Sequence, residues 1–164
     1  MRRSAALTLL LSCSHAPSAP PDLAPPADFA HPPFCTDGAD GGPAPTFANV
    51  QLIFTNNCAF QGGCHDPTGP GQDAVAMTQD LRAGHAYAAI VNVPSTEMCG
   101  LRVSPGNPDQ SFLYRKISQA APCASGCNPF PAHCSQMPLG ETPIPLRDCE
   151  QKVIHDWISD GAMP

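Results

Sequence analysis

Residues 146–160 (LRDCEQKVIHDWISD) carry the clearest periodic pattern in the chain. Apolar side chains recur three or four positions apart, which predicts an amphipathic helix with one buried face. That face is expected to contain Cys149, Val153, Ile154, Trp157 and Ile158, and the charged residues Arg147, Glu150, Lys152 and Asp156 are expected away from it. Gly161 follows as a natural C-cap. The chain therefore closes with a helix that must pack on a hydrophobic core.

Three shorter segments upstream are also expected to be helical. Residues 46–57 start at Thr46, a good N-cap, and present an apolar face. That face contains Phe47, Val50, Ile53 and Phe54. Residues 84–91 form a short second helix. A third opens with Asn107 as N-cap and Pro108 in the first turn, where the missing N–H of proline has no cost, and continues to residue 117.

The rest of the domain shows little periodicity. Residues 121–140 are rich in Cys, Pro, Gly, Ser and Asn, and they are expected to form a long loop held by cysteines. No segment shows strong strand-type alternation. We therefore expect a mostly α fold, in which residues 46–164 form one small helical domain with long disulfide-stapled loops.

The N-terminal residues have the layout of an export signal. Residues 1–12 combine Arg2 and Arg3 with an apolar run, and a small residue then precedes Cys13. This layout predicts a signal peptide over residues 1–12 and lipidation of Cys13, with plain secretion as the alternative. The Pro-rich residues 13–45 cannot bury enough apolar surface to fold and are expected to form a tether. The domain is thus predicted to be exported and held by a lipid anchor in the periplasm or at the outer membrane.

Charge and composition narrow the class of partner. The formal net charge is −6 at pH 7, which argues against nucleic acid as a partner. The sequence lacks a serine-nucleophile motif and a recognisable carboxylate pair, so an independent enzyme is not expected. The remaining classes of protein are an electron carrier and a binding module.

Cys58, Cys64 and His65 have the order that covalent haem attachment requires. Two thiols must reach the porphyrin vinyl groups, while the imidazole next to the second cysteine lies beneath the iron. Five residues separate these cysteines, whereas the common motif has about two, and Gly62 and Gly63 would let the longer loop fold back. The pattern predicts a site for haem c.

Met137 is the expected second iron ligand, because it lies in a distant loop before the terminal helix. The alternative is that its side chain is simply packed in the core. His133, four residues earlier, is the spare candidate for the same position.

Six further cysteines are expected to form three disulfides, since an exported domain matures in an oxidising compartment. They are Cys35, Cys99, Cys123, Cys127, Cys134 and Cys149. Their connectivity cannot be deduced from spacing. A zinc site from Cys123, Cys127, Cys134 and His133 is the alternative.

The order of these motifs resembles the planctomycete-type cytochrome c domain over nearly all of residues 46–162. The matching pieces are Cys58 with Gly63-Cys64-His65, then Val103-Ser104-Pro105-Gly106-Asn107-Pro108-Asp109-Gln110-Ser111-Phe112-Leu113, then Met137-Pro138, and finally Asp156-Trp157-Ile158-Ser159-Asp160-Gly161-Ala162. The resemblance implies thioethers at Cys58 and Cys64, with His65 as proximal and Met137 as distal ligand. Two features depart from the family: the expanded cysteine spacing, and Arg147 where a Ser or Thr N-cap is usual.

The expected function is that of a lipid-anchored, cytochrome-c-like domain that binds one haem and exchanges single electrons with redox partner proteins. The alternative is a haem-free relative of the same fold that serves as a structural or binding module. In that alternative, Cys58 and Cys64 form a small disulfide. A Soret band and a covalent mass increase are expected for the first possibility alone.

Overall fold

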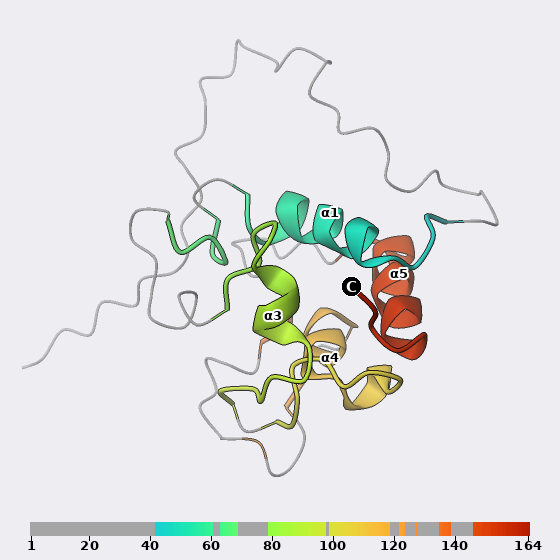
Figure 1. The fold of residues 1–164 in the computed structure, drawn as a ribbon. Helices are drawn as coiled ribbons and strands as arrows, with labels where there is room; N and C mark the ends of the chain where they lie inside the picture. The colour runs from blue at the N-terminus through green and yellow to red at the C-terminus, as the bar shows by residue number, and fades with distance from the viewer. Residues whose placement is uncertain are drawn as a thin grey trace, which may run out of the picture.

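The computed structural model describes residues 42–60, 63–68, 79–97, 99–118, 122–123, 127, 135–138 and 146–164. Its named elements are α1 (Phe47–Asn57), α3 (Ala86–Ile90), the 3-10 helix η2 (Pro108–Gln110), α4 (Phe112–Ser118) and α5 (Asp148–Ser159), as Figure 1 shows. Within these ranges the chain is helical, with two isolated β-bridges and no named strand. The mostly α class expected from the sequence is confirmed for this part of the chain.

Helix α1 forms where the sequence predicts it. The Thr46 hydroxyl oxygen accepts the Asn49 backbone N–H at 3.4 Å, so Thr46 is the N-cap. The buried residues of the helix are Val50, Ile53 and Phe54. Phe47 packs its ring on Trp157 of α5, with 5.5 Å between the ring centroids. The predicted apolar face is therefore the one that packs against α5.

Helix α5 supplies the centre of the core. The predicted residues Val153, Ile154, Trp157 and Ile158 are each at most 4 % exposed. The expectation that Glu150 lies away from the buried face is wrong, because this residue is buried. Its carboxylate accepts the Arg147 backbone N–H at 3.0 Å and the Arg147 guanidinium at 3.1 Å. Glu150 thus caps a helix that has no Ser or Thr N-cap, and its charge suits the positive end of the helix dipole.

The chain turns back after α5, and Figure 1 marks the C-terminus among α1, α3 and α5. Ala162 is buried there, whereas Met163 is exposed. Gly161 reverses the chain in the left-handed conformation, with φ +97°. The carbonyl of the buried Ala162 then accepts the Tyr87 hydroxyl at 3.0 Å. The Met163 carbonyl accepts the Trp157 indole N–H at 2.7 Å. The backbone carbonyls of Ala162 and Met163 thus tie the C-terminal residues to α3 and α5.

The middle helix is split, in contrast to the single helix expected. Pro108–Gln110 forms a 3-10 turn, Ser111 interrupts the helix, and α4 begins at Phe112. The side chain of Ser111 is completely buried. Its hydroxyl accepts the Ser104 N–H at 2.9 Å and donates to the Asn107 carbonyl at 2.9 Å. A serine that bonds to nearby backbone groups competes with helix continuation, which explains the break.

The second predicted helix is present but shorter, as α3. Two bridges follow it, a parallel one between Val91 and Val103 and an antiparallel one between Pro94 and Leu101. The Arg102 N–H donates to the Val93 carbonyl at 2.7 Å. These contacts pair the two arms of a turn that contains the cysteine at position 99.

The predicted signal peptide, the predicted lipidation site at Cys13 and most of the tether lie outside the described residues. They stay predictions. Among the helices that the structure describes, none is long and apolar enough to cross a membrane.

Candidate functional site

Backbone hydrogen bonds close the loop between Cys58 and His65. The His65 N–H donates to the Cys58 carbonyl at 3.0 Å, and the Gly63 N–H donates to the Phe60 carbonyl at 2.6 Å. A Cβ on Gly63 would lie 2.8 Å from the Phe60 oxygen and 3.1 Å from the Cys58 oxygen. Glycine is therefore required at this close approach, and the expanded loop does fold back on itself.

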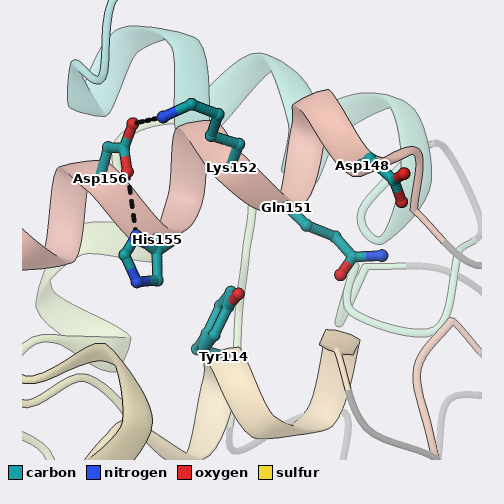
Figure 2. Close-up of a pocket in the computed structure, with 6 residues that line it drawn as sticks. All are labelled: Tyr114, Asp148, Gln151, Lys152, His155 and Asp156. Atoms are coloured by element: carbon teal, nitrogen blue, oxygen red, sulfur yellow. Dashed lines mark hydrogen bonds and ion pairs between the residues drawn. The ribbon is translucent and has the colours of Figure 1, made fainter.

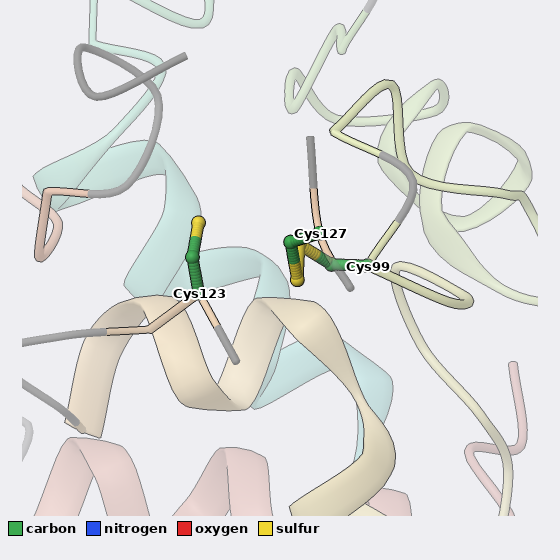
Figure 3. A group of neighbouring side chains, drawn as sticks. All are labelled: Cys99, Cys123 and Cys127. Atoms are coloured by element: carbon green, nitrogen blue, oxygen red, sulfur yellow. A yellow bond between two sulfur atoms is a disulfide. The ribbon is translucent and has the colours of Figure 1, made fainter. Parts of the chain in front are cut away.

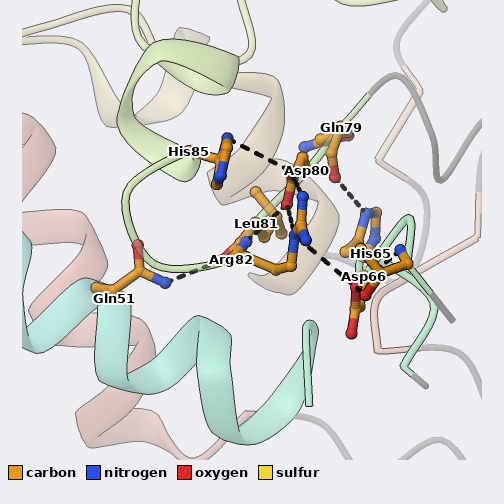
Figure 4. A network of polar contacts seen from close by, with 9 residues as sticks. Gln51, His65, Asp66, Gln79, Asp80, Leu81, Arg82 and His85 are labelled. Atoms are coloured by element: carbon orange, nitrogen blue, oxygen red, sulfur yellow. Dashed lines mark hydrogen bonds and ion pairs between the residues drawn. The ribbon is translucent and has the colours of Figure 1, made fainter. Parts of the chain in front are cut away.

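A backbone carbonyl orients the His65 imidazole. The ring Nδ1 donates to the Gln79 carbonyl at 3.2 Å, as Figure 4 shows. The Leu81 N–H donates to the His65 carbonyl at 3.1 Å. A carbonyl that holds the Nδ1 proton fixes the ring tautomer, and histidines that bind a metal through Nε2 commonly use this arrangement.

An ion cluster holds the same loop to the segment before α3 (Figure 4). Arg82 contacts the Asp80 carboxylate through two nitrogens, at 2.9 and 2.6 Å, and its Nε lies 3.8 Å from the Asp66 carboxylate. The hydrogen bonds from Arg82 hold the pKa of Asp80 below its usual value. Asp66 is buried and accepts the Thr68 N–H at 2.9 Å. The loop that carries His65 is thus held by polar contacts on both sides.

Cys58 carries a free thiol. The residue is half-buried and packs against the hydrophobic core. Burial raises the pKa of the Cys58 thiol to about 12, and the negative charge of Glu150 adds to this effect. The thiol is therefore protonated and a poor nucleophile at neutral pH. Because Cys58 is free, the Cys58–Cys64 disulfide expected for the haem-free alternative is not formed.

Cys64 is disulfide-bonded in this structure. A sulfur atom in a disulfide cannot also form a thioether to a porphyrin vinyl group. The other sulfur of the motif, on Cys58, belongs to a buried thiol with a raised pKa. The cysteines of the motif therefore do not fit covalent haem in this oxidation state, although the orientation of His65 fits a metal ligand.

Met137 lies against the end of α4. Its N–H donates to the Lys116 carbonyl at 2.7 Å, and its half-buried side chain packs against the core. The Lys116 ammonium donates to the Ser135 carbonyl at 2.9 Å, and the Gln136 amide donates to the Ile117 carbonyl at 3.1 Å. Core packing and these three hydrogen bonds are sufficient to hold Met137 where it lies.

Two of the six cysteines expected in disulfides are paired with each other. Cys99 and Cys127 form a disulfide, with 4.6 Å between their Cα atoms. Cys123 and Cys149, which were also expected in disulfides, are each disulfide-bonded. Cys64, which was expected to bind haem, is disulfide-bonded as well. The expectations for Cys35, Cys134 and His133 concern positions outside the described residues and stay predictions.

A polar groove that no sequence motif indicates lies between α4 and α5 (Figure 2). It has a volume of about 400 Å³ and is lined by Tyr114, Asp148, Gln151, Lys152, His155 and Asp156. Asp156 pairs with both Lys152 and His155. The hydrogen bond from Lys152, and after it the one with His155, lowers the pKa of Asp156. The Tyr114 ring meets the His155 ring edge-on at 5.2 Å between centroids. The i,i+4 spacing of Lys152 and Asp156 signals the ion pair in the sequence, whereas the place of Tyr114 depends on how α4 packs.

No protein-family model, curated protein or solved structure matches this chain. The likeness to the planctomycete-type cytochrome c domain therefore rests on the order of the sequence motifs.

Proposed function

We propose that this chain is an exported, lipid-anchored, haem-free domain that acts as a disulfide-stapled structural or binding module. The observation that carries the proposal is the state of the two motif cysteines. Cys64 is disulfide-bonded, and Cys58 is a buried thiol whose pKa is raised to about 12. Covalent haem attachment needs two available thiols, and this state offers none that is both free and accessible.

The construction of the domain supports a scaffold role. Its core is a short set of helices, and a core of this size holds long loops poorly without crosslinks. The Cys99–Cys127 disulfide and the disulfides at Cys64, Cys123 and Cys149 supply such crosslinks. The groove between α4 and α5 presents polar side chains from two packed helices, so it offers a surface of fixed shape to a ligand or a partner.

The test uses the full chain produced in a host that has haem-attachment machinery and an oxidising export compartment. We expect no Soret band and an intact mass without the increment of one haem. Thiol alkylation after denaturation without reductant should label Cys58 and leave Cys64 unlabelled. The matched control, Cys58→Ser, should lose this label and keep the mass pattern of its disulfides. A haem group covalently bound to the peptide that spans Cys58 and Cys64 would refute the proposal.

A second candidate function is single-electron transfer by a cytochrome-c-like domain with redox partner proteins. The hydrogen bond from His65 Nδ1 to the Gln79 carbonyl favours it, because proximal histidines are held in this way. This candidate requires that Cys64 be reduced before haem attachment. In it, His65→Ala would perturb the Soret band, whereas in the haem-free module the same substitution would have no visible spectrum to change.

The anchoring part of the proposal rests on Cys13 and is tested separately. Wild-type protein should partition into the detergent phase, and Cys13→Ser should move to the aqueous phase. An unchanged partition would remove the lipid anchor from the proposal and leave the disulfide-stapled domain unaffected.

A further inference from the structure

Three sulfur atoms gather at one place outside the haem motif. The Sγ atoms of Cys99, Cys123 and Cys127 all lie within 4.8 Å of one another (Figure 3). Cys99 is buried, and the other two residues are half-buried. In the oxidised domain Cys99 and Cys127 share a disulfide, and Cys123 belongs to another one.

The arrangement of these sulfurs suits a soft metal ion. Around a zinc ion, thiolate sulfurs lie about 2.3 Å from the metal, so neighbouring sulfurs are about 3.8 Å apart. Three residues separate Cys123 from Cys127, which is within the usual spacing of paired zinc-binding cysteines. Once the Cys99–Cys127 disulfide and the disulfide of Cys123 are both reduced, small rotations of the side chains would bring the three sulfurs to this separation.

The third sulfur comes from a preformed turn. The Cys99 N–H donates to the Ser95 hydroxyl at 2.9 Å, and the Ser95 N–H donates to the Gly100 carbonyl at 2.8 Å. Gly100 adopts the left-handed conformation, with φ +91°. These contacts do not involve the disulfide, so they can hold Cys99 in place after reduction.

A half-buried cation, Arg115, contacts the backbone of Cys99 in the sulfur cluster. Arg115 donates through Nη2 to the Cys99 carbonyl at 2.6 Å, and its buried Nε has no hydrogen-bond partner among the described residues. Three thiolates and one divalent cation leave a net charge of about −1. The Arg115 guanidinium favours such an anionic centre, and it also favours the thiolate form of a nearby cysteine. Glu97, two residues before Cys99, carries the opposite charge in the same turn.

We propose that the reduced domain binds one soft divalent metal ion, such as Zn²⁺, through Cys99, Cys123 and Cys127. The disulfide and metal forms exclude each other, because they use the same sulfurs. Reduction of each disulfide consumes two electrons and two protons and yields two thiols. Metal binding then releases one proton from each of the three thiols. In the experiment below a phosphine supplies the electrons and becomes a phosphine oxide with oxygen from water.

The direct test maps which thiols the metal protects. The full chain is reduced with the phosphine under anaerobic conditions and titrated with Cd²⁺ as the probe ion, and its thiols are then alkylated and located by mass spectrometry. We expect one Cd²⁺ per chain and protection of Cys99, Cys123 and Cys127 together. Oxidised wild-type protein should bind no Cd²⁺. Alkylation of any of the three in the Cd²⁺ complex, or equal binding by the oxidised protein, would overturn the proposal.

Variants then separate ligands from neighbours. Cys123→Ser should lower the affinity for Cd²⁺ by more than about 100-fold, whereas Cys58→Ser, the matched control, should leave it unchanged. Arg115→Gln keeps all three sulfurs and should weaken binding by about 10-fold, which is typical for a group outside the ligands. Far-ultraviolet circular dichroism checks folding. If a variant is unfolded, the thiol-protection pattern of the wild-type chain is the test of the three ligands. If Cys58→Ser and Cys123→Ser are both folded and bind Cd²⁺ with equal affinity, the proposal is contradicted.

Discussion

Two regions of this domain are stabilised in different ways. The helical region, made of α1, α5 and residues 161–164, is held by close packing: Phe54, Ile154 and Trp157 are at most 1 % exposed. The cysteine region, by which we mean residues 95–97, 99–100, 122–123, 127 and 135–138, is held by the Cys99–Cys127 disulfide and by hydrogen bonds to α4. Apolar burial is sufficient where a periodic sequence presents one continuous face. Segments without regular secondary structure in a small domain need disulfides and hydrogen bonds in addition to apolar burial.

The contrast predicts different sensitivities. The helical region should respond to lost side-chain volume, and the cysteine region should respond to reduction.

Trp157→Ala should lower the free energy of unfolding by about 3–5 kcal/mol, because it opens a cavity at the centre of the helical region. Denaturant unfolding measures this loss. The control on the same region is Leu52→Ala, which removes a side chain on α1 that is 50 % exposed. The control should change stability by less than about 0.5 kcal/mol. Similar effects of the two substitutions would contradict the packing of α1 on α5.

The double substitution Cys99→Ser/Cys127→Ser should lower the free energy of unfolding by about 3–4 kcal/mol, the entropy of closing a loop of this size. The two cysteines are 28 residues apart in sequence. Equilibrium unfolding without reductant measures the change, and the helical circular dichroism of the native state should persist. No loss of stability would mean that hydrogen bonds alone hold the cysteine region.

Ser111→Ala should lower the free energy of unfolding by about 1–2 kcal/mol, because it removes the acceptor of the part-buried Ser104 N–H. Thermal unfolding at neutral pH measures the effect. Ser118→Ala is the matched control, because the Ser118 hydroxyl donates to the Tyr114 carbonyl. Removal of this hydroxyl leaves no backbone N–H without an acceptor. An equal effect of both substitutions would argue against the role of Ser111 in splitting the middle helix.

Stability should fall at alkaline pH through Cys58. Its pKa is about 12 in the folded chain, above the ordinary value of 9.0, so the unfolded chain loses the thiol proton first. The stabilising contribution is complete below pH 9 and is lost as pH rises towards 12. Between pH 9 and 10 the loss is about 1 kcal/mol. Urea unfolding of the wild-type protein and of Cys58→Ala at pH 9 and pH 10 isolates the contribution of Cys58 to the free energy of unfolding. If both proteins lost the same stability between these pH values, Cys58 would not be the cause.

Lys152→Ala should change stability least, by less than about 0.5 kcal/mol. The ion pair of Lys152 with Asp156 lies at the surface, where solvent screens it and the side chains lose freedom. Chemical unfolding at low and high salt measures the difference. A larger loss would mean that the groove between α4 and α5 contributes to the fold, in addition to offering a polar surface.

The helices and their apolar faces could be predicted because they depend on local pattern. The N-cap at Thr46 and the buried Val153, Ile154, Trp157 and Ile158 were expected and are found. The apolar pattern failed where a polar side chain bonds to backbone groups a few residues away. Glu150 is buried because it caps α5, and Ser111 splits the middle helix because it bonds to the turn before it.

The candidate site divides in the same way. The fold-back of the loop from Cys58 to His65 could be expected from Gly63, since a requirement for glycine is a backbone property. The bonding of Cys64 to a cysteine other than Cys58, the raised pKa of Cys58 and the approach of Cys99 to Cys123 and Cys127 could not be expected. Each depends on residues that are far apart in sequence.

The sequence by itself thus determined the mostly α class, the buried faces of α1 and α5, and the residue types available for sulfur chemistry. Only the packed chain decides which of those sulfurs meet and that burial raises the pKa of the Cys58 thiol. The physical reason is one of range. Helix periodicity, capping and turn formation act over a few residues, whereas disulfide pairing and desolvation depend on the contacts that the packed chain creates.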